Sequence, residues 1–125
     1  APSVLADRAQ EFFDLPAPSP FMQFTVRVKA SAKGILPAVT HVDGTARVQT
    51  VTREANPRFY DLLATFGRLT GVPVLLNTSF NVQEPIVCTP EDAVRCFQRT
   101  QVEWLVLGNL LVGRSSPPAI SNHAC

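Results

Sequence analysis

One stretch, Gly71-Val72-Pro73-Val74-Leu75-Leu76-Asn77-Thr78-Ser79-Phe80-Asn81, passes from an apolar run directly into a polar one and decides the fold. Residues 72–76 are short and almost wholly apolar, which predicts a strand covered on both faces. The preceding segment 57–70 starts with proline, has apolar residues at helical spacing and ends at Gly71, so it predicts a helix. A helix, a buried strand and a polar run in this order are typical of α/β domains, which bind ligands at the carboxyl ends of their strands.

The segments before this stretch predict another helix and a hairpin. Ser3 is a possible N-cap, and apolar residues follow it at helical spacing, so residues 3–14 are predicted to be helical. Residues 21–29 alternate between apolar and polar, which predicts a half-buried strand. Asp43-Gly44 separates the β-branched runs 39–42 and 45–51, and this pattern favours a hairpin with a primed turn.

The segments after the polar run complete a single predicted domain. Thr89 precedes proline and two acidic residues, which predicts a helix over residues 90–100, and residues 104–107 are expected to form the last strand. Residues 1–113 are therefore assigned to one domain, and residues 114–125 to a flexible tail. A hairpin that precedes two strand-helix units favours a mixed sheet with helices packed on it, of α/β or α+β class.

Composition excludes several classes of protein. The chain is 46% hydrophobic and 17% charged, and its net charge of +1 gives no overall field for nucleic acid or an acidic membrane. Three cysteines without metal-ligand spacing indicate reduced thiols and no metal site. No apolar run is long enough to span a bilayer and no secretory signal is visible, so a cytoplasmic protein is expected.

The polar run offers the first candidate site. Asn77, Thr78, Ser79 and Asn81 carry amides and hydroxyls that, with loop N–H groups, could hold a phosphate or a carbamoyl group. The alternative is that these residues only form turns and caps. No Walker A, GxGxxG, HExxH or GxSxG motif occurs, and no pair of carboxylates has a spacing that demands acid-base work.

The predicted hairpin offers the second candidate. Thr45, Arg47 and Gln49 share one face of a strand, and a planar guanidinium can donate to several phosphate oxygens. The alternative for Arg47 is a solvated surface salt bridge. His41 is either a general base or a core histidine, and without an identifiable partner a structural or ligand-contacting role is favoured.

Four ordered strings of the sequence are distinctive, at residues 19–22, 37–51, 71–81 and 84–90. They closely resemble the carboxyl-terminal domain of O-carbamoyltransferases that modify nodulation factors, aminoglycosides and cephalosporin-type antibiotics, and the collinear resemblance extends over nearly all of residues 1–112. It implies a YrdC-like twisted mixed sheet that condenses carbamoyl phosphate and ATP into carbamoyl adenylate with release of pyrophosphate. In this family a separate amino-terminal domain with an iron site then transfers the carbamoyl group to a hydroxyl acceptor.

The resemblance also implies roles for individual residues. Arg47 corresponds to an arginine that contacts phosphate, and Ser79 and Asn81 correspond to an S-x-N element of the activating site. His41, Thr45, Asn77 and Thr78 are expected to contact substrate or nucleotide. Mg²⁺ is expected to accompany ATP, held mainly by phosphates and water.

The chain also departs from the family pattern. In the family, a Lys- and Arg-bearing stretch ending in Arg-Pro-Phe precedes the counterpart of Ala1, and these basic groups are missing here. The chain alone is therefore expected to bind nucleotide weakly and not to turn over. The partners implied are an amino-terminal transferase domain or, in an alternative function, further copies of the chain in an oligomeric binding or assembly module that uses the same scaffold without catalysis.

Overall fold

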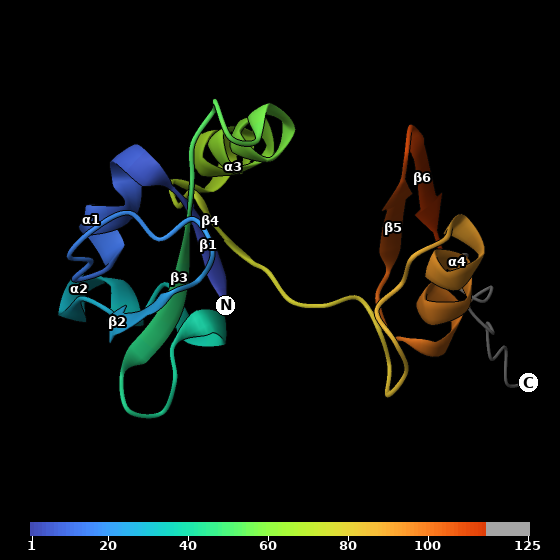
Figure 1. The fold of residues 1–125 in the computed structure, drawn as a ribbon, viewed down its shortest axis with the longest axis horizontal. Helices are drawn as coiled ribbons and strands as arrows, with labels where there is room; N and C mark the ends of the chain where they lie inside the picture. The colour runs from blue at the N-terminus through green and yellow to red at the C-terminus, as the bar shows by residue number, and fades with distance from the viewer. Residues whose placement is uncertain (115–125) are drawn as a thin grey trace, which may run out of the picture. The chain divides into compact units, whose positions relative to one another are not determined.

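The computed structural model describes residues 1–114 and has a mixed α/β fold, as the sequence predicted. The chain divides into two compact units, Ala1–Thr78 and a second unit that begins at Ser79 (Figure 1). The predicted tail lies outside the described residues except for Arg114. No helix in the described range is both long and apolar enough to cross a membrane.

The first unit is built on a four-stranded sheet in the order β2-β3-β1-β4. Its strands are β1 (Pro2–Leu5), β2 (Phe24–Arg27), β3 (Thr45–Val51) and β4 (Val74–Leu76). β1 runs parallel to β3 and antiparallel to β4, while β2 runs antiparallel to β3. The sheet is therefore mixed, which confirms the sequence prediction.

Two separate apolar clusters cover the two faces of this sheet. On one face α1 (Ala9–Phe12), α2 (Ala30–Lys33) and the 3-10 turn η2 (Pro37–Val39) pack on the sheet, and η1 (Ala6–Arg8) joins β1 to α1. On the other face α3 (Pro57–Thr70) buries Leu63 against Leu5 and Val51. The larger cluster comprises Val4, Ala9, Phe12, Phe13, Leu15, Val26, Val28, Ala32, Leu36, Val39, Ala46, Val48 and Val74.

The helix predicted over residues 3–14 is wrong in its first half. Residues 2–5 form β1, and all four are buried because β3 and β4 flank them on both sides. A surface helix needs a polar face, which a central strand does not have, so sheet pairing overrides the helical spacing. Ala9 and Phe12 are buried as predicted, but in a helix of only one turn.

The predicted hairpin is also wrong, although β3 itself is confirmed. Val39 ends η2 and Val42 is fully exposed, so no strand precedes the Asp43-Gly44 turn. β3 pairs instead with β2, because Val26 faces the buried Ala46 across the sheet. Of the two central residues Asp43 and Gly44, only Gly44 has a positive φ, 81°, and a primed turn of type I′ would require it at both.

The central helix and its boundaries follow the prediction closely. Asn56 accepts a hydrogen bond from the Phe59 N–H at 3.1 Å, Pro57 is the first helical residue, and Gly71 follows the last turn with φ of 80°. Proline at this position and a left-handed glycine after the helix are local signals. Residues 72–76 were predicted to form a strand covered on both faces. The observed strand β4 lies instead at the edge of the sheet, and Leu76 is 57% exposed.

The second unit contains α4 (Pro90–Arg99) and the hairpin of β5 (Trp104–Leu107) and β6 (Leu110–Gly113). Ala93 and Phe97 are buried as predicted, whereas Val94 is 39% exposed. The prediction that residues 104–107 form the last strand is wrong, because β6 follows them. The Arg114 guanidinium lies over the Phe97 ring and donates to the carbonyls of Phe97 and Thr100, so it joins the end of β6 to the end of α4.

Candidate functional site

One face of the first unit carries a polar region beside the end covered by α3. On β3 the side chains of Thr45, Arg47 and Gln49 alternate with the buried residues Ala46 and Val48. Because α3 packs against Leu5 and Val51 on this same face, the polar part of the face begins where the α3 contact ends. The sequence correctly placed the three polar residues of β3 on one face.

Gln49 is the centre of this polar region. Its Oε1 accepts hydrogen bonds from the Ser3 hydroxyl at 2.6 Å and from Asn77 Nδ2 at 2.9 Å, and its Nε2 donates to the Pro20 carbonyl at 3.1 Å. Ser3 is fully buried and Gln49 is half-buried. The side chain therefore joins β3 to β1, to the residue after β4 and to the proline-rich connector.

Arg47 lies on the same face and remains exposed. Within residues 1–114 the ion pairs are Arg8–Glu11, Arg53–Asp61, Arg95–Asp92 and Arg99–Glu84, and Arg47 takes part in none of them. The salt bridge considered as the alternative for Arg47 is thus not formed with any described carboxylate. Its guanidinium is available to donate to an anion from this face.

His41 and Thr45 come together in the turn before β3. The Thr45 hydroxyl donates to Asp43 Oδ1 at 2.7 Å, so it accepts from His41 Nδ1 at 3.1 Å, which places the proton of a neutral imidazole on Nδ1. The hydrogen bonds from the hydroxyl and the N–H of Thr45 lower the pKa of Asp43. The donor capacity of Thr45 is used inside the turn, while His41 Nε2 remains on the exposed side.

Asn77 and Thr78 follow β4, but they do not lie at the carboxyl end of a parallel strand, as the sequence predicted. Because β4 is antiparallel to β1, its carboxyl end lies beside the amino end of β1, where Asn77 N–H donates to the Ala1 carbonyl at 2.7 Å. Ligand binding at the carboxyl ends of parallel strands is therefore no argument for a site at Asn77 and Thr78. Asn77 is instead brought to the Arg47 face by its hydrogen bond to Gln49.

Ser79 and Asn81 belong to the second unit. Asn81 Nδ2 donates to the Glu84 carbonyl at 2.7 Å and closes a turn in which Gln83 has a φ of 52°, while Ser79 is exposed. This bond agrees with the turn-forming alternative for Asn81. The roles of Ser79 and Asn81 in an activating site stay predictions.

A pocket that the sequence did not predict lies where the parallel strands β1 and β3 both end. It has a volume of about 340 Å³ and is lined by Ala6, Asp7, Thr52, Arg53, Glu54 and Tyr60. The Arg53 guanidinium lies 4.6 Å from the centre of the Tyr60 ring and forms an ion pair with Asp61 at 2.8 Å. The parallel pairing that creates this pocket was not visible in the sequence, because β1 was predicted to be helical.

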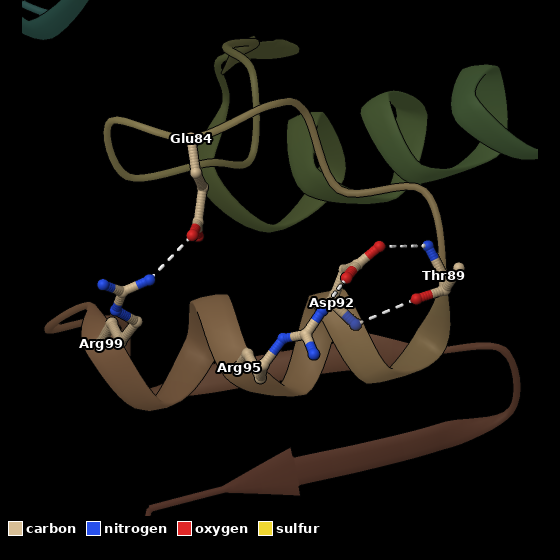
Figure 2. A network of polar contacts seen from close by, with 5 residues as sticks. All are labelled: Glu84, Thr89, Asp92, Arg95 and Arg99. Atoms are coloured by element: carbon tan, nitrogen blue, oxygen red, sulfur yellow. Dashed lines mark hydrogen bonds and ion pairs between the residues drawn. The ribbon is translucent and has the colours of Figure 1, made fainter.

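A second charged pocket, in the second unit, is explained by local structure (Figure 2). It has a volume of about 320 Å³, and its lining includes Glu84, Cys88 and Arg95. Figure 2 shows Thr89 and Asp92 forming a reciprocal capping box, Arg95 pairing with Asp92, and Arg99 pairing with Glu84 at 2.7 Å. The capping box and the Arg95–Asp92 pair stabilise the start of α4, whereas Arg99 in the last turn of α4 pairs with Glu84.

The polar region of the first unit suits phosphate oxygens better than a metal ion. The exposed guanidinium of Arg47 can donate hydrogen bonds to an anion. Within residues 1–114 no group of three or more His, Cys, Asp or Glu side chains is arranged to hold a metal.

The fold and this face define a mixed α/β domain with an exposed arginine beside a network of side-chain amides. The chain belongs to the carbamoyltransferase C-terminus family, whose pattern it matches over residues 1–114. It is 47% identical to nodulation protein NolO of Bradyrhizobium diazoefficiens over 98% of its length, and 51% identical to nodulation protein NolNO of Sinorhizobium fredii over 90%. An uncharacterized protein of Synechocystis is 47% identical over 94% of the chain.

These relatives are much longer proteins. The chain spans 23% of the NolO and Synechocystis proteins and 17% of NolNO. It therefore corresponds to about a fifth of each relative, and the family membership predicted from the sequence strings is confirmed.

Proposed function

We propose that this chain is part of a domain that activates carbamoyl phosphate with ATP, giving carbamoyl adenylate for transfer to a hydroxyl acceptor. The membership in the carbamoyltransferase C-terminus family supports the carbamoyl chemistry. The observation that carries the proposal is the exposed Arg47 guanidinium, which has no ion-pair partner among the described residues and shares its face with the amides of Gln49 and Asn77.

The proposed reaction needs groups that stabilise negative charge on phosphorus-bound oxygens. Water releases phosphate from carbamoyl phosphate, and the resulting carbamate oxygen forms a bond to the α-phosphorus of ATP while the bond to the pyrophosphate oxygen breaks. The products are carbamoyl adenylate, pyrophosphate and phosphate. A fixed guanidinium can stabilise the charge that develops on phosphoryl oxygens without covalent chemistry, and this is the role proposed for Arg47.

Neighbouring residues have supporting roles in this proposal. His41 is proposed to contact the ligand through Nε2, since Nδ1 is bound to Thr45. Thr78 is proposed as a further hydrogen-bonding group for substrate or nucleotide. Because the chain spans only about a fifth of its relatives' length, weak binding without turnover is the proposed behaviour of the chain alone.

Calorimetric titration of the whole chain with carbamoyl phosphate and with ATP plus Mg²⁺ tests the proposal. Saturable binding is expected, and Arg47→Ala should abolish it because the main charged donor is removed. Arg58→Ala is the matched control, since Arg58 is an exposed arginine on α3. Absence of binding by the unchanged chain, or equal loss in both variants, would contradict the proposal.

A second candidate function is an oligomeric binding or assembly module. It is favoured by the apolar surface of the β5–β6 hairpin, where Trp104 is 60% exposed, Val106 70%, and Leu110 and Leu111 66% each. Exposed apolar surface of this kind commonly marks an interaction site. Sedimentation velocity that shows a concentration-dependent oligomer, together with no calorimetric binding of carbamoyl phosphate or ATP, would support this function over the first.

A further inference from the structure

The amide of Gln49 can have only one orientation. Its nitrogen lies 3.1 Å from the Pro20 carbonyl oxygen, and a carbonyl oxygen can only accept a hydrogen bond. Nε2 must therefore face Pro20, and Oε1 must face the other two partners. These are the Ser3 hydroxyl at 2.6 Å and Asn77 at 2.9 Å, which both donate to Oε1.

The orientation of Gln49 determines the orientation of Asn77 in turn. Because Oε1 of Gln49 can only accept, Asn77 must present Nδ2 to it, and its own Oδ1 must point elsewhere. The backbone of Asn77 is held as well, since its N–H donates to the Ala1 carbonyl at 2.7 Å and its carbonyl accepts from Ala1 N at 3.1 Å. Among the described residues, no hydrogen-bond donor to Asn77 Oδ1 is present, so Asn77 offers a fixed acceptor.

This acceptor lies on the same face of the sheet as Arg47. The parallel register pairs Ser3 with Gln49, and Asn77 is bonded both to Gln49 and to Ala1 at the start of β1. Arg47 precedes Gln49 by two residues on the same face of β3, a rise of roughly 7 Å along the strand. A long arginine side chain and an asparagine on one face can therefore contact the two ends of a ligand as small as carbamoyl phosphate.

We propose that Asn77 is a specificity-determining residue that recognises the NH₂ group of the carbamoyl moiety, while Arg47 binds the phosphate. The inference rests on the proposed function and adds a basis for ligand selection. A carbamoyl NH₂ group donates hydrogen bonds and can satisfy Asn77 Oδ1, whereas the methyl group of an acetyl analogue cannot. Gln49 is the positioning residue, because it prevents the Asn77 amide from turning its own NH₂ group toward the ligand.

The test compares two hydrolytically stable phosphonates that differ only at this group. Phosphonoacetamide carries the NH₂ group and 2-oxopropylphosphonate carries a methyl group in its place. Titration calorimetry on the whole chain should give phosphonoacetamide an affinity about tenfold higher, the size expected for one additional hydrogen bond. Asn77→Ala should remove this preference by lowering the affinity for phosphonoacetamide about tenfold.

Gln49→Ala tests the positioning role separately. It should reduce the preference for phosphonoacetamide, and the side-chain amide protons of Asn77 should exchange faster with solvent in nuclear magnetic resonance spectra. Gln23→Ala is the matched control, because Gln23 is an exposed glutamine next to β2 whose side chain is not part of the network. Circular dichroism establishes that each variant is folded.

The outcomes separate the two proposals. Equal affinities of the unchanged chain for the two phosphonates, or a preference that survives Asn77→Ala, overturn the assignment of Asn77 and leave the proposed function standing. If the unchanged chain binds neither phosphonate and does not bind carbamoyl phosphate, both the assignment of Asn77 and the proposed function are overturned. A preference that is lost in Asn77→Ala, reduced in Gln49→Ala and kept in Gln23→Ala supports the inference.

Discussion

The Ser3 hydroxyl donates to Gln49 Oε1 at 2.6 Å across the parallel pair of β1 and β3. Ser3 is fully buried, so this bond satisfies a polar group that has no access to water. It also connects the interior of the sheet to the amide network that reaches Asn77.

Removing this hydroxyl should destabilise the first unit. Ser3→Ala is expected to lower the free energy of unfolding by about 1 kcal/mol, the typical net value of a buried hydrogen bond. Urea unfolding followed by circular dichroism measures it. Ser31→Ala, at an exposed position of α2, should change the free energy by less than about 0.5 kcal/mol. Equal unfolding midpoints for the two variants would contradict a stabilising role for the Ser3–Gln49 bond.

A side chain at Gly44 should strain the turn before β3. Its φ of 81° disfavours other residues, and an added Cβ would lie 2.7 Å from Lys33 Nζ. Gly44→Ala should destabilise the protein by roughly 1–2 kcal/mol, chiefly through backbone strain, because the end of the lysine can move. Gly34→Ala provides the comparison in a thermal unfolding series. Gly34 has a helical φ of −69° and open space around it, so its replacement should be neutral or slightly stabilising.

Arg114 should stabilise the second unit more than an ordinary surface arginine does. It donates to three carbonyls, those of Phe97, Thr100 and Val102, and so satisfies the end of α4. Arg114→Ala should cost about 1–2 kcal/mol and increase hydrogen exchange in residues 96–107. Arg99→Ala removes only the exposed pair with Glu84 and should have a smaller effect. Unchanged exchange in the Arg114 variant would show that these bonds do not stabilise α4.

Acid should weaken the start of α4. Hydrogen bonding with Thr89, and further with Arg95, lowers the pKa of Asp92 in the folded state below its usual value. The unfolded chain therefore binds more protons in this range, so stabilisation by Asp92 is present above its unfolded pKa and is lost as the pH falls through its folded pKa. The hydrogen-exchange protection factors of α4, which correct for the intrinsic rate at each pH, should fall on acidification, and Asp92→Asn should show a smaller change. Glu91→Gln is the control, since Glu91 is acidic in the same turn but is not part of the capping box; an equal reduction in both variants would argue against Asp92.

Local signals were sufficient for the two longer helices. The Asn56 cap, Pro57 and Gly71 set the ends of α3, and Thr89 with Asp92 sets the start of α4. These interactions join residues a few positions apart, so the sequence contains both partners within one short window. Alternation along β3 likewise predicted the shared face of Thr45, Arg47 and Gln49.

Non-local pairing was responsible for the errors. Residues 2–5 have helical spacing, yet they form the central strand β1 because β3 and β4 bond to them from distant parts of the chain. The strand predicted at residues 39–42 does not form, because β2 pairs with β3 in its place. No periodicity within a single segment indicates which strand will pair with it.

By itself, the sequence determined the family, the mixed α/β class, the two capped helices and the position of Arg47 on a polar strand face. Only the tertiary structure decided what surrounds Arg47. Gln49 is separated by 46 residues from Ser3 and by 28 from Asn77, and the sheet order β2-β3-β1-β4 is what brings the three side chains together. A hydrogen-bond network of this kind depends on strand register, which arises from the packing of the whole sheet.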